Sequence, residues 1–530
     1  MRLSWALTLN SKISFGLRRC FSSSTVSKHI KYQAFSYGQG YLGTLGGSDF
    51  VDVPVPKPIP ALLESDVGAV DCGWGHSAFL SRDGKALAVC GRPLDFRNTL
   101  RNISIRKGGL TFVQTAMNEL ARFLFPSDIG PQITLSSSIL GNSEDSLVHL
   151  VCGKGGLTGL VSRSGRAYVF GGNKFGQCGV GVPPQVSGSD VISLPLPDST
   201  SSSTKMSHVA GIDEKEGIVC LALGLEHGLA VTNTGNLYSW GRGDRGQLGH
   251  AQSAAHLFKA VCVMGPSFTW AGGHRIVAAQ AGASQSAAID IDGRLWVWGK
   301  MNSLEQKEAR ADGYLMRDQI EPRLVTFPDE EIDGIVTNQL IDNSASDTNV
   351  LKKCLEDRDV GNVLTLEQER MLPVVRADTL RSGKGVVMGV NNDIANGKRK
   401  RKVSAVSISQ AHTSILTDDG RMWQIGLRGR GILFDTESSE SPDPQLPEVY
   451  SQTSPLEIDA GPLKSLSVIA LRSGLHHTLA LTECGRVFRW GWKGVVRELT
   501  SEELGEIANG GRIVDLSLGY CHTVLLAKTV

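Results

Sequence analysis

Short apolar runs recur along the chain, and each is followed by a glycine-containing turn and a second short run that ends on an aromatic residue and glycine. Residues 478–481 and 487–490 form one such pair. The turns commonly read Asp-Gly, Ser-Gly or Thr-Gly, which supply the positive φ that tight hairpins need. Another apolar run, such as residues 403–408, precedes most pairs. The pattern therefore predicts hairpins grouped into small antiparallel sheets.

Seven segments share one plan, namely a small turn residue, a histidine three positions later, an apolar run, a turn glycine and a closing aromatic-glycine pair. The histidines are His76, His227, His412, His477 and His522. Eight residues lead from this position to the turn glycine in five units, and six lead from there to the closing glycine in five units. The first unit is one residue longer, from Gly84 to Gly91, which predicts a β-bulge in its third strand.

The two ends of the chain carry complementary halves of one unit. The last unit, from Leu518, lacks its aromatic-glycine half, whereas residues 37–46 supply that half without a histidine. A single unit cannot bury both of its faces, so we expect the units to stack radially and the ring to close. The predicted fold is all-β: a seven-bladed β-propeller of four-stranded blades, closed by N- and C-terminal segments that share one blade.

The motif W-G-x4-G-Q-L-G, joined to G-x-x-H-(S/T), resembles the regulator of chromosome condensation family over nearly all of residues 37–528. A WD-type propeller is disfavoured, because no Gly-His to Trp-Asp pairing recurs. Within the family, the chain is similar to the mitochondrial branch, the G-exchanging-factor-like proteins. The similarity lies in its N-terminal composition, the F-G-Q-C-G at residues 175–179 and the H-x-V-x-L-A-K ending.

Residues 1–31 are expected to be a mitochondrial presequence and linker, and residues 32–530 a single propeller. Three stretches exceed the repeat and are predicted insertions, at about 92–146, 181–206 and 328–402. A short helix is expected within the first of them, at residues 115–125.

No Asp or Glu occurs from Met1 to Ser48, while Lys and Arg recur and Ser is plentiful, a composition typical of mitochondrial transit peptides. Arg19, Phe21 and Ser22 fit a matrix-protease site with cleavage after Phe21. The predicted location is the matrix or the matrix face of the inner membrane. A secretory or plastid signal and an untargeted tail stay open as alternatives.

The bulk composition excludes several broad classes. The 54 basic and 53 acidic residues give a net charge of +1, which argues against a globally basic nucleic-acid-binding chain. The ten cysteines show no C-x-x-C pair, so free thiols in a reducing compartment are expected. No apolar window is long enough to predict a transmembrane segment, and peripheral association with the inner membrane stays open.

The repeat residues do not point to catalysis. One histidine per blade cannot converge on a metal or a substrate, and we expect the histidines to satisfy backbone groups inside each blade. Trp240, Trp298 and Trp490 are expected to pack the blades. Two G-x-G-x-x-G matches fall within the repeat's own turns and open no helix, and there is no P-loop motif. No catalytic residue, cofactor or metal site is predicted.

One dense run of charge stands out, formed by Lys398, Arg399, Lys400, Arg401 and Lys402. It is open to three interpretations: a solvated loop, contact with the phosphates of RNA or with an acidic lipid surface, and a nuclear import signal.

The resemblance implies a monomeric, partner-binding ring without an active site of its own. One implied function is guanine-nucleotide exchange on a mitochondrial GTPase. The alternative is a non-catalytic assembly factor or RNA-binding scaffold in mitochondrial ribosome biogenesis or RNA metabolism, with rRNA or assembly factors as partners.

Overall fold

The computed structural model describes residues 31–40, 43–47, 51–91, 132–135, 140, 145–181, 207–213, 215–250, 256–266, 273–300, 318–327, 401–409, 412–429, 449–474, 477–491 and 496–529. Within them, strands dominate and helices are short. The helical segments are η2 (Pro60–Leu62), η4 (Gly461–Ser465), α8 (Ser501–Leu504) and η5 (Gly505–Asn509). None of the helices in these ranges has the length and apolarity needed to cross a membrane.

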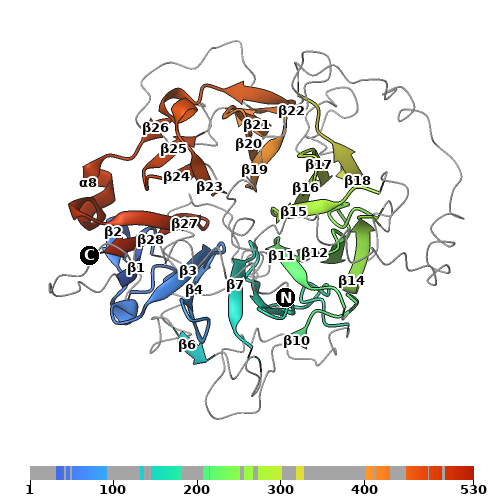
Figure 1. Cartoon of the computed structure of the whole chain (residues 1–530), viewed down its shortest axis with the longest axis horizontal. Helices are drawn as coiled ribbons and strands as arrows, with labels where there is room; N and C mark the ends of the chain where they lie inside the picture. Colours follow the sequence, from blue (N-terminus) through green and yellow to red (C-terminus); the bar gives the residue numbers. More distant parts are fainter. Residues whose placement is uncertain are drawn as a thin grey trace, which may run out of the picture.

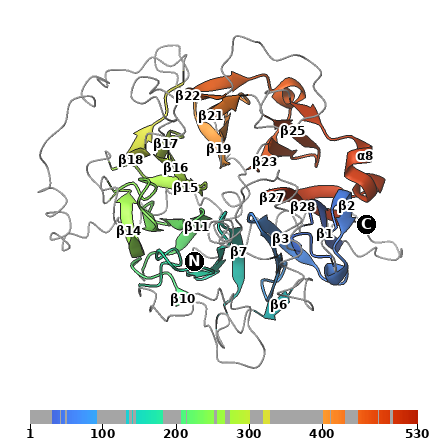
Figure 2. The ribbon, with the colours of Figure 1, turned by 180° about the vertical axis from the view of Figure 1, so that it is seen from behind.

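The strands form seven four-stranded antiparallel sheets set radially around one axis (Figures 1 and 2). From the axis outward, the blades are blade 1, β3 (Val67–Cys72), β4 (His76–Ser81), β5 (Ala86–Gly91) and β6 (Gln132–Leu135); blade 2, β7 (Leu147–Cys152), β8 (Thr158–Ser162), β9 (Ala167–Phe170) and β10 (Ser207–His208); blade 3, β11 (Ile218–Leu223), β12 (His227–Thr232), β13 (Leu237–Gly241) and β14 (Leu257–Met264); blade 4, β15 (Ile276–Ala281), β16 (Gln285–Asp290), β17 (Leu295–Lys300) and β18 (Asp318–Leu324); blade 5, β19 (Val403–Ile408), β20 (His412–Thr417), β21 (Met422–Gly429) and β22 (Val449–Ile458); blade 6, β23 (Val468–Ser473), β24 (His477–Thr482), β25 (Val487–Gly491) and β26 (Arg497–Glu498); and blade 7, β27 (Arg512–Leu518), β28 (His522–Thr529), β1 (Lys31–Gly38) and β2 (Val53–Pro58). The predicted seven-bladed propeller is confirmed.

The two ends of the chain meet in blade 7. Strand β1 pairs with β28 over its whole length, from Lys31 opposite Thr529 to Gly38 opposite His522. The backbone N–H of Gln39 donates to the Cys521 carbonyl at 2.9 Å and continues the pairing beyond the strands. Closure by the terminal half-units is therefore confirmed, and it removes the open edges that a linear array would expose.

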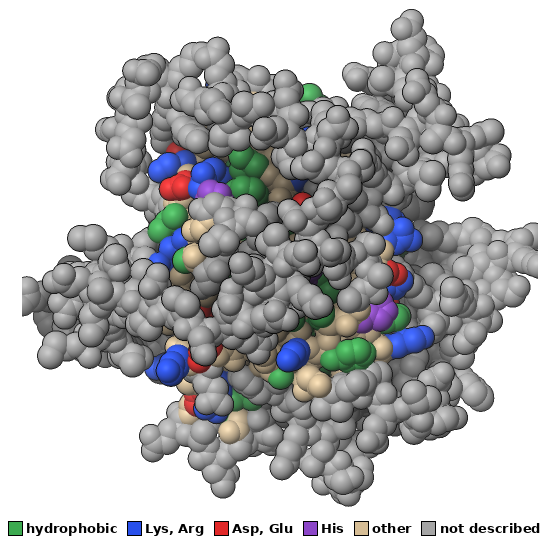
Figure 3. All heavy atoms as spheres, turned by 90° about the vertical axis from the view of Figure 1, so that its right-hand side faces the viewer, with side chains coloured by type: hydrophobic (Ala, Val, Ile, Leu, Met, Phe, Trp, Pro, Cys, Tyr) green, Lys and Arg blue, Asp and Glu red, His purple; other side chains and the backbone are tan. Residues whose placement is uncertain are grey.

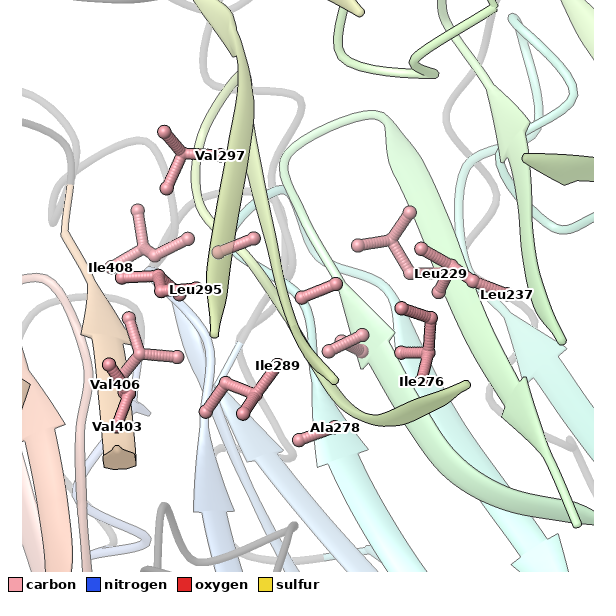
Figure 4. Close-up of a cluster of buried hydrophobic side chains, with 14 of the residues drawn as sticks. Leu229, Leu237, Ile276, Ala278, Ile289, Leu295, Val297, Val403, Val406 and Ile408 are labelled. Atoms are coloured by element: carbon pink, nitrogen blue, oxygen red, sulfur yellow. The ribbon is translucent and has the colours of Figure 1, made fainter. Parts of the chain in front are cut away.

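The second strand of a blade is buried on both faces, because it lies between neighbouring blades. All six residues of β12 and all six of β20 are buried. This explains why the sequence shows continuous short apolar runs there and no strict alternation. Figure 4 shows one resulting cluster, in which Leu229, Ile276, Leu295 and Val406 bring blades 3, 4 and 5 together.

The extra residue of blade 1 lies in the hairpin turn and not in the strand. Pairing of β4 with β5 is regular, from His76 opposite Gly91 to Leu80 opposite Leu87. Two residues, Lys85 and Ala86, separate Gly84 from Leu87, the last residue that pairs with β4, and the φ of Gly84 is +71°. Ser81 Oγ accepts the backbone N–H of Ala86 at 2.8 Å and stabilises the longer turn. The predicted β-bulge is therefore wrong, because a longer turn absorbs the residue without disturbing the ladder.

The stretch at about 92–146 is only partly an insertion. It contains β6, the outer strand of blade 1, which pairs with β5 from Ala86 opposite Leu135 to Val89 opposite Gln132. The helix expected at residues 115–125 lies outside the described residues, as do residues 182–206 and 328–400.

Candidate partner-binding face

The ring has two faces with different kinds of connection. Because the strands are antiparallel, the loops from first to second strand and from third to fourth strand open on one side, which we call the loop face. The hairpin turns and the links between blades lie on the opposite side, which we call the turn face. The third-to-fourth connections of the loop face range from residues 492–496 in blade 6 to residues 92–131 in blade 1, while the longest connection of all, residues 325–402, links blades 4 and 5 on the turn face.

A ring of small residues surrounds the axis where each inner strand ends. A Cβ built on Gly73 would lie 2.5 Å from the Gly153 carbonyl oxygen and 2.2 Å from Cε1 of His76. Equivalent close approaches to a backbone carbonyl oxygen join Gly153 to Gly224, Gly224 to Gly282 and Gly519 to Gly73. The small residue three positions before the histidine is therefore required by close backbone packing around the axis.

The repeat histidines reach the neighbouring blade. His76 Nε2 lies 3.2 Å from Thr158 Oγ1, and His227 Nε2 lies 3.0 Å from Ser286 Oγ. His412 and His522 make the same contact with Thr478 and Ser77, at 3.0 and 2.9 Å. The expectation that the histidines serve groups inside each blade is therefore wrong for Nε2, which joins one blade to the next.

The hydroxyl partners of two of these histidines determine which ring nitrogen carries the proton. Ser286 Oγ donates to the Gln247 carbonyl at 2.8 Å, so it can only accept from His227, whose Nε2 therefore carries the proton. Ser77 donates to the Thr44 carbonyl at 2.8 Å and constrains His522 in the same way. Burial lowers the pKa of His227 to about 4 and that of His522 to about 3. Both imidazoles are neutral at pH 7.

His477 begins β24 and lies opposite Gly491, the register position that the other repeat histidines occupy.

The repeat tryptophans pack against the preceding blade. Trp240 and Trp298 are fully buried, and their indole N–H groups donate to the carbonyls of Gln177 and Gln247 at 3.0 and 2.9 Å. Trp490 is buried in blade 6 with 2% of its surface exposed. The G-Q-(L/C)-G segment of one blade thus receives the closing aromatic residue of the next.

A second polar connection between inner strands was not anticipated from the sequence. Asp71 accepts the backbone N–H of Cys152 in blade 2 at 2.7 Å and the hydroxyl of Ser517 in blade 7 at 2.6 Å. Ser517 Oγ also accepts the backbone N–H of Cys72 at 3.0 Å. The signal that could have revealed this connection is positional, because Asp71 and Ser517 each stand one residue before the end of an inner strand.

On the loop face, blades 2 and 3 share a fixed charged cluster. Arg242 donates from Nη1 to Glu226 at 2.6 Å and from Nε to Asp244 at 2.7 Å. Its guanidinium lies 4.8 Å from the ring centre of Phe175, which in turn meets His256 edge-on at 5.1 Å. The ion pairs lower the pKa of the Asp244 carboxyl against the opposing effect of burial, which is the largest single influence. The cluster is rigid and only partly covered, as suits a contact surface.

The basic run is divided by the fold. Arg401 pairs with Asp419 at 3.1 Å, and its guanidinium lies 4.8 Å from the ring centre of Trp423 and 5.5 Å from that of Phe327. Only 10% of its side chain is exposed, so Arg401 is engaged in the propeller. Lys402 is partly exposed beside it, while Lys398, Arg399 and Lys400 lie outside the described residues.

The visible described surface shows no concentration of basic charge. In Figure 3, Lys and Arg side chains are scattered among acidic and apolar ones.

The predicted cleavage residues Arg19, Phe21 and Ser22 lie outside the described residues. Across the ranges that the structure covers, no three His, Cys, Asp or Glu side chains are grouped to hold a metal ion.

Parts of this sequence match known repeat families. Profiles described as "Regulator of chromosome condensation (RCC1) repeat" match residues 33–80, 218–247 and 234–289. The chain carries regulator of chromosome condensation repeats. The histidine-to-hydroxyl contacts and the glycine ring described above are thus the packing of these repeats in this chain.

Two curated relatives of this repeat propeller match over part of their length. The secretion-regulating guanine nucleotide exchange factor of Mus musculus is 27% identical over 320 residues, 60% of this chain and 58% of that protein. The ultraviolet-B receptor UVR8 of Arabidopsis thaliana is 26% identical over 227 residues, 43% of this chain and 41% of the receptor. In each case the match spans less than two thirds of the relative.

Among solved structures, that of human WBSCR16 superposes with a TM-score of 0.58 at 18% identity, covering 94% of this chain and 99% of that one. At this identity the similarity shows the shared propeller fold.

Proposed function

We propose that this repeat propeller is a regulator that binds a small GTPase through its loop face and accelerates release of the bound guanine nucleotide. The observation that carries the proposal is the similarity over 320 residues to a guanine nucleotide exchange factor. Exchange of this kind needs no covalent chemistry. The ring has only to bind the nucleotide-free conformation of its partner more tightly than the nucleotide-bound one.

The loop face has two features that suit this role. Its connections differ in length and composition from blade to blade, and such differences provide specificity. The Arg242 cluster offers partly exposed side chains already fixed by ion pairs with Glu226 and Asp244, so little conformational entropy is lost on docking. Arg and aromatic residues such as Phe175 are enriched among contacts that dominate binding.

The test is release of a fluorescent GDP analogue from a panel of purified small GTPases, with the ring at catalytic concentration. Acceleration of at least about tenfold for one GTPase is expected, together with its loss in Arg242→Glu. Lys215→Glu, an exposed substitution on the turn face, is the matched control and should retain activity. The proposal is abandoned if no GTPase responds, or if Lys215→Glu loses activity while Arg242→Glu retains it.

We also propose that the chain acts inside mitochondria. Support comes from the acid-free, Arg- and Ser-containing composition of the N-terminal segment and from the Arg19, Phe21 and Ser22 spacing. Sequencing the N-terminus of the mature protein should place it at Ser22. A mature protein that begins at Met1 or is recovered outside mitochondria would contradict the proposal.

A further inference from the structure

The residues that follow the axial glycines surround the axis on the loop face. Trp74, Lys154, Leu225, Ala283 and Tyr520 occupy this position in blades 1, 2, 3, 4 and 7, and all five are partly exposed. We call these five residues the axis mouth. Because the glycines beneath them pack backbone to backbone, the five positions are fixed with respect to one another.

Two aromatic rings and one cation lie on consecutive blades of the axis mouth. Trp74 and Tyr520 meet edge-on, with ring centres 5.4 Å apart and an interplanar angle of 68°. Lys154 follows in blade 2, and its backbone N–H donates to the Gly224 carbonyl at 3.0 Å, which fixes the base of its side chain. Blades 7, 1 and 2 therefore present an apolar surface directly beside a positive charge.

The charge of Lys154 is attracted to the Asp71 carboxylate without a direct ion pair. Within the described residues, its ammonium makes no hydrogen bond or ion pair. The neighbouring carboxylate, Asp71, already accepts from Cys152 and Ser517 with its two oxygens. Arg472, a second cation with 9% exposure, also acts on Lys154. Burial lowers the pKa of Lys154, the negative charge of Asp71 opposes that effect, and the positive charge of Arg472 adds to it to a smaller extent. An incoming carboxylate would give the Lys154 ammonium a direct, charge-assisted hydrogen bond.

We propose that the axis mouth is a docking site for an acidic segment of a protein partner, in which a carboxylate pairs with Lys154 and a neighbouring apolar side chain packs against Trp74 and Tyr520. The inference rests on the proposed role of the loop face as a docking surface, but not on exchange activity. Leu225 and Ala283 add two apolar side chains to the axis mouth on blades 3 and 4.

A peptide fits this chemistry better than a nucleic acid. Single-stranded RNA is held by a track of cations and by open aromatic faces on which bases stack. Lys154 is the one cation among the five residues of the axis mouth. In the edge-on contact between Trp74 and Tyr520, the edge of one ring also points at the face of the other. One carboxylate beside an apolar group is the better complement.

The test uses the whole chain and a fluorescein-labelled hexapeptide of alternating glutamate and phenylalanine, with binding followed by fluorescence anisotropy. We expect salt-sensitive binding that Lys154→Met weakens about tenfold or more, because a charge-assisted hydrogen bond is lost. Lys215→Met on the turn face is the matched control and should bind as the unaltered chain does. Lys154→Arg should retain binding, and it keeps the test decisive if Lys154→Met does not fold.

Equal binding of the peptide to Lys154→Met and to the unaltered chain would overturn the proposal. So would Lys154-dependent binding of a hexauridylate in the absence of peptide binding, which would indicate an RNA site. Because no GTPase is present, peptide binding can succeed where nucleotide release fails, and the two proposals are judged separately.

Discussion

The joint that closes the ring and the joint between blades 2 and 3 solve the same packing problem with opposite chemistry. At the closing joint, His522 bonds Ser77, and Ser517 links Asp71 with the Cys72 backbone. Between blades 2 and 3, the histidine position holds Leu157 and the hydroxyl position holds Gly228.

The apolar joint replaces hydrogen bonds with close packing. Leu157 belongs to a buried cluster with Val151 and Trp240. A Cβ on Gly228 would lie 2.4 Å from the Trp240 ring, so glycine is needed where that ring crosses. The two positions therefore change as a pair: histidine faces a hydroxyl, and leucine faces a glycine covered by tryptophan. In the polar pair, Nε2 and the hydroxyl satisfy each other, while Nδ1 of His76, His227 and His522 is buried without a hydrogen-bond partner among the described residues. A mixed pair would leave a further buried polar group unsatisfied.

The largest effect is expected from opening the closing joint. Ending the chain at Cys521 removes β28, which pairs with β27 and β1, and exposes an edge on each. We expect loss of cooperative thermal unfolding, measured by circular dichroism, and rapid proteolysis. Removing residues 1–30, which precede β1, is the control and should leave the unfolding temperature unchanged. A truncated chain that unfolds at the original temperature would show that the ring does not depend on this closure.

Acid should distinguish the two joints. The pKa of His227 falls from an unfolded value near 6.5 to about 4 on folding, so the unfolded chain binds protons more readily. The stability that this histidine contributes is present above pH 6.5 and is lost as the pH falls through 4. At pH 5 the free energy of unfolding is lower by roughly 2 kcal/mol for each such histidine. His76 and His522 shift in the same direction.

Hydrogen exchange at pH 7 and pH 5 measures this difference blade by blade. Amides of β4, which carries His76 and the Ser77 partner of His522 at the closing joint, should lose protection at pH 5 before those of β8, which receives one such contact, from His76 to Thr158. Equal loss in both strands would argue that global unfolding, and not these histidines, sets the acid response.

A smaller effect is expected from substitution of Asp71, which accepts hydrogen bonds from both neighbouring blades. Asp71→Ala leaves the Cys152 N–H without its acceptor and breaks the bond from Ser517, at a cost of about 3 kcal/mol in the free energy of unfolding. Val151 holds the same position in blade 2, and Val151→Ala should cost only about 1 kcal/mol. Urea denaturation of both variants compares the polar and apolar forms of one position. Equal losses would mean that the Asp71 bonds add nothing beyond packing.

The sequence predicts the architecture well because the repeat is local. Turn glycines such as Gly235 lie within a few residues of the closing aromatic-glycine pairs, and each terminal half-unit is recognisable from its own residues, so local spacing reveals them. The partners between blades are different, because Ser286 is 59 residues from His227 and Thr478 is 66 residues from His412. Arg401 was grouped with its basic neighbours, yet Phe327 and Trp423 enclose it. Such contacts depend on how the blades are stacked, which no local pattern encodes.

The smallest effect is expected when the histidine and hydroxyl pair between blades 3 and 4 is replaced by the leucine and glycine pair found between blades 2 and 3. His227→Leu leaves Ser286 bonded to the Gln247 carbonyl, so no donor is stranded, and a loss of about 1 kcal/mol is expected. Adding Ser286→Gly reproduces the Leu157 and Gly228 pair between blades 3 and 4. In a double-mutant cycle the two changes should couple by about 0.5–1 kcal/mol, because each removes the partner of the other. Strict additivity would show that the hydrogen bond between these side chains contributes nothing, and that the match between histidine and hydroxyl along the chain has another cause.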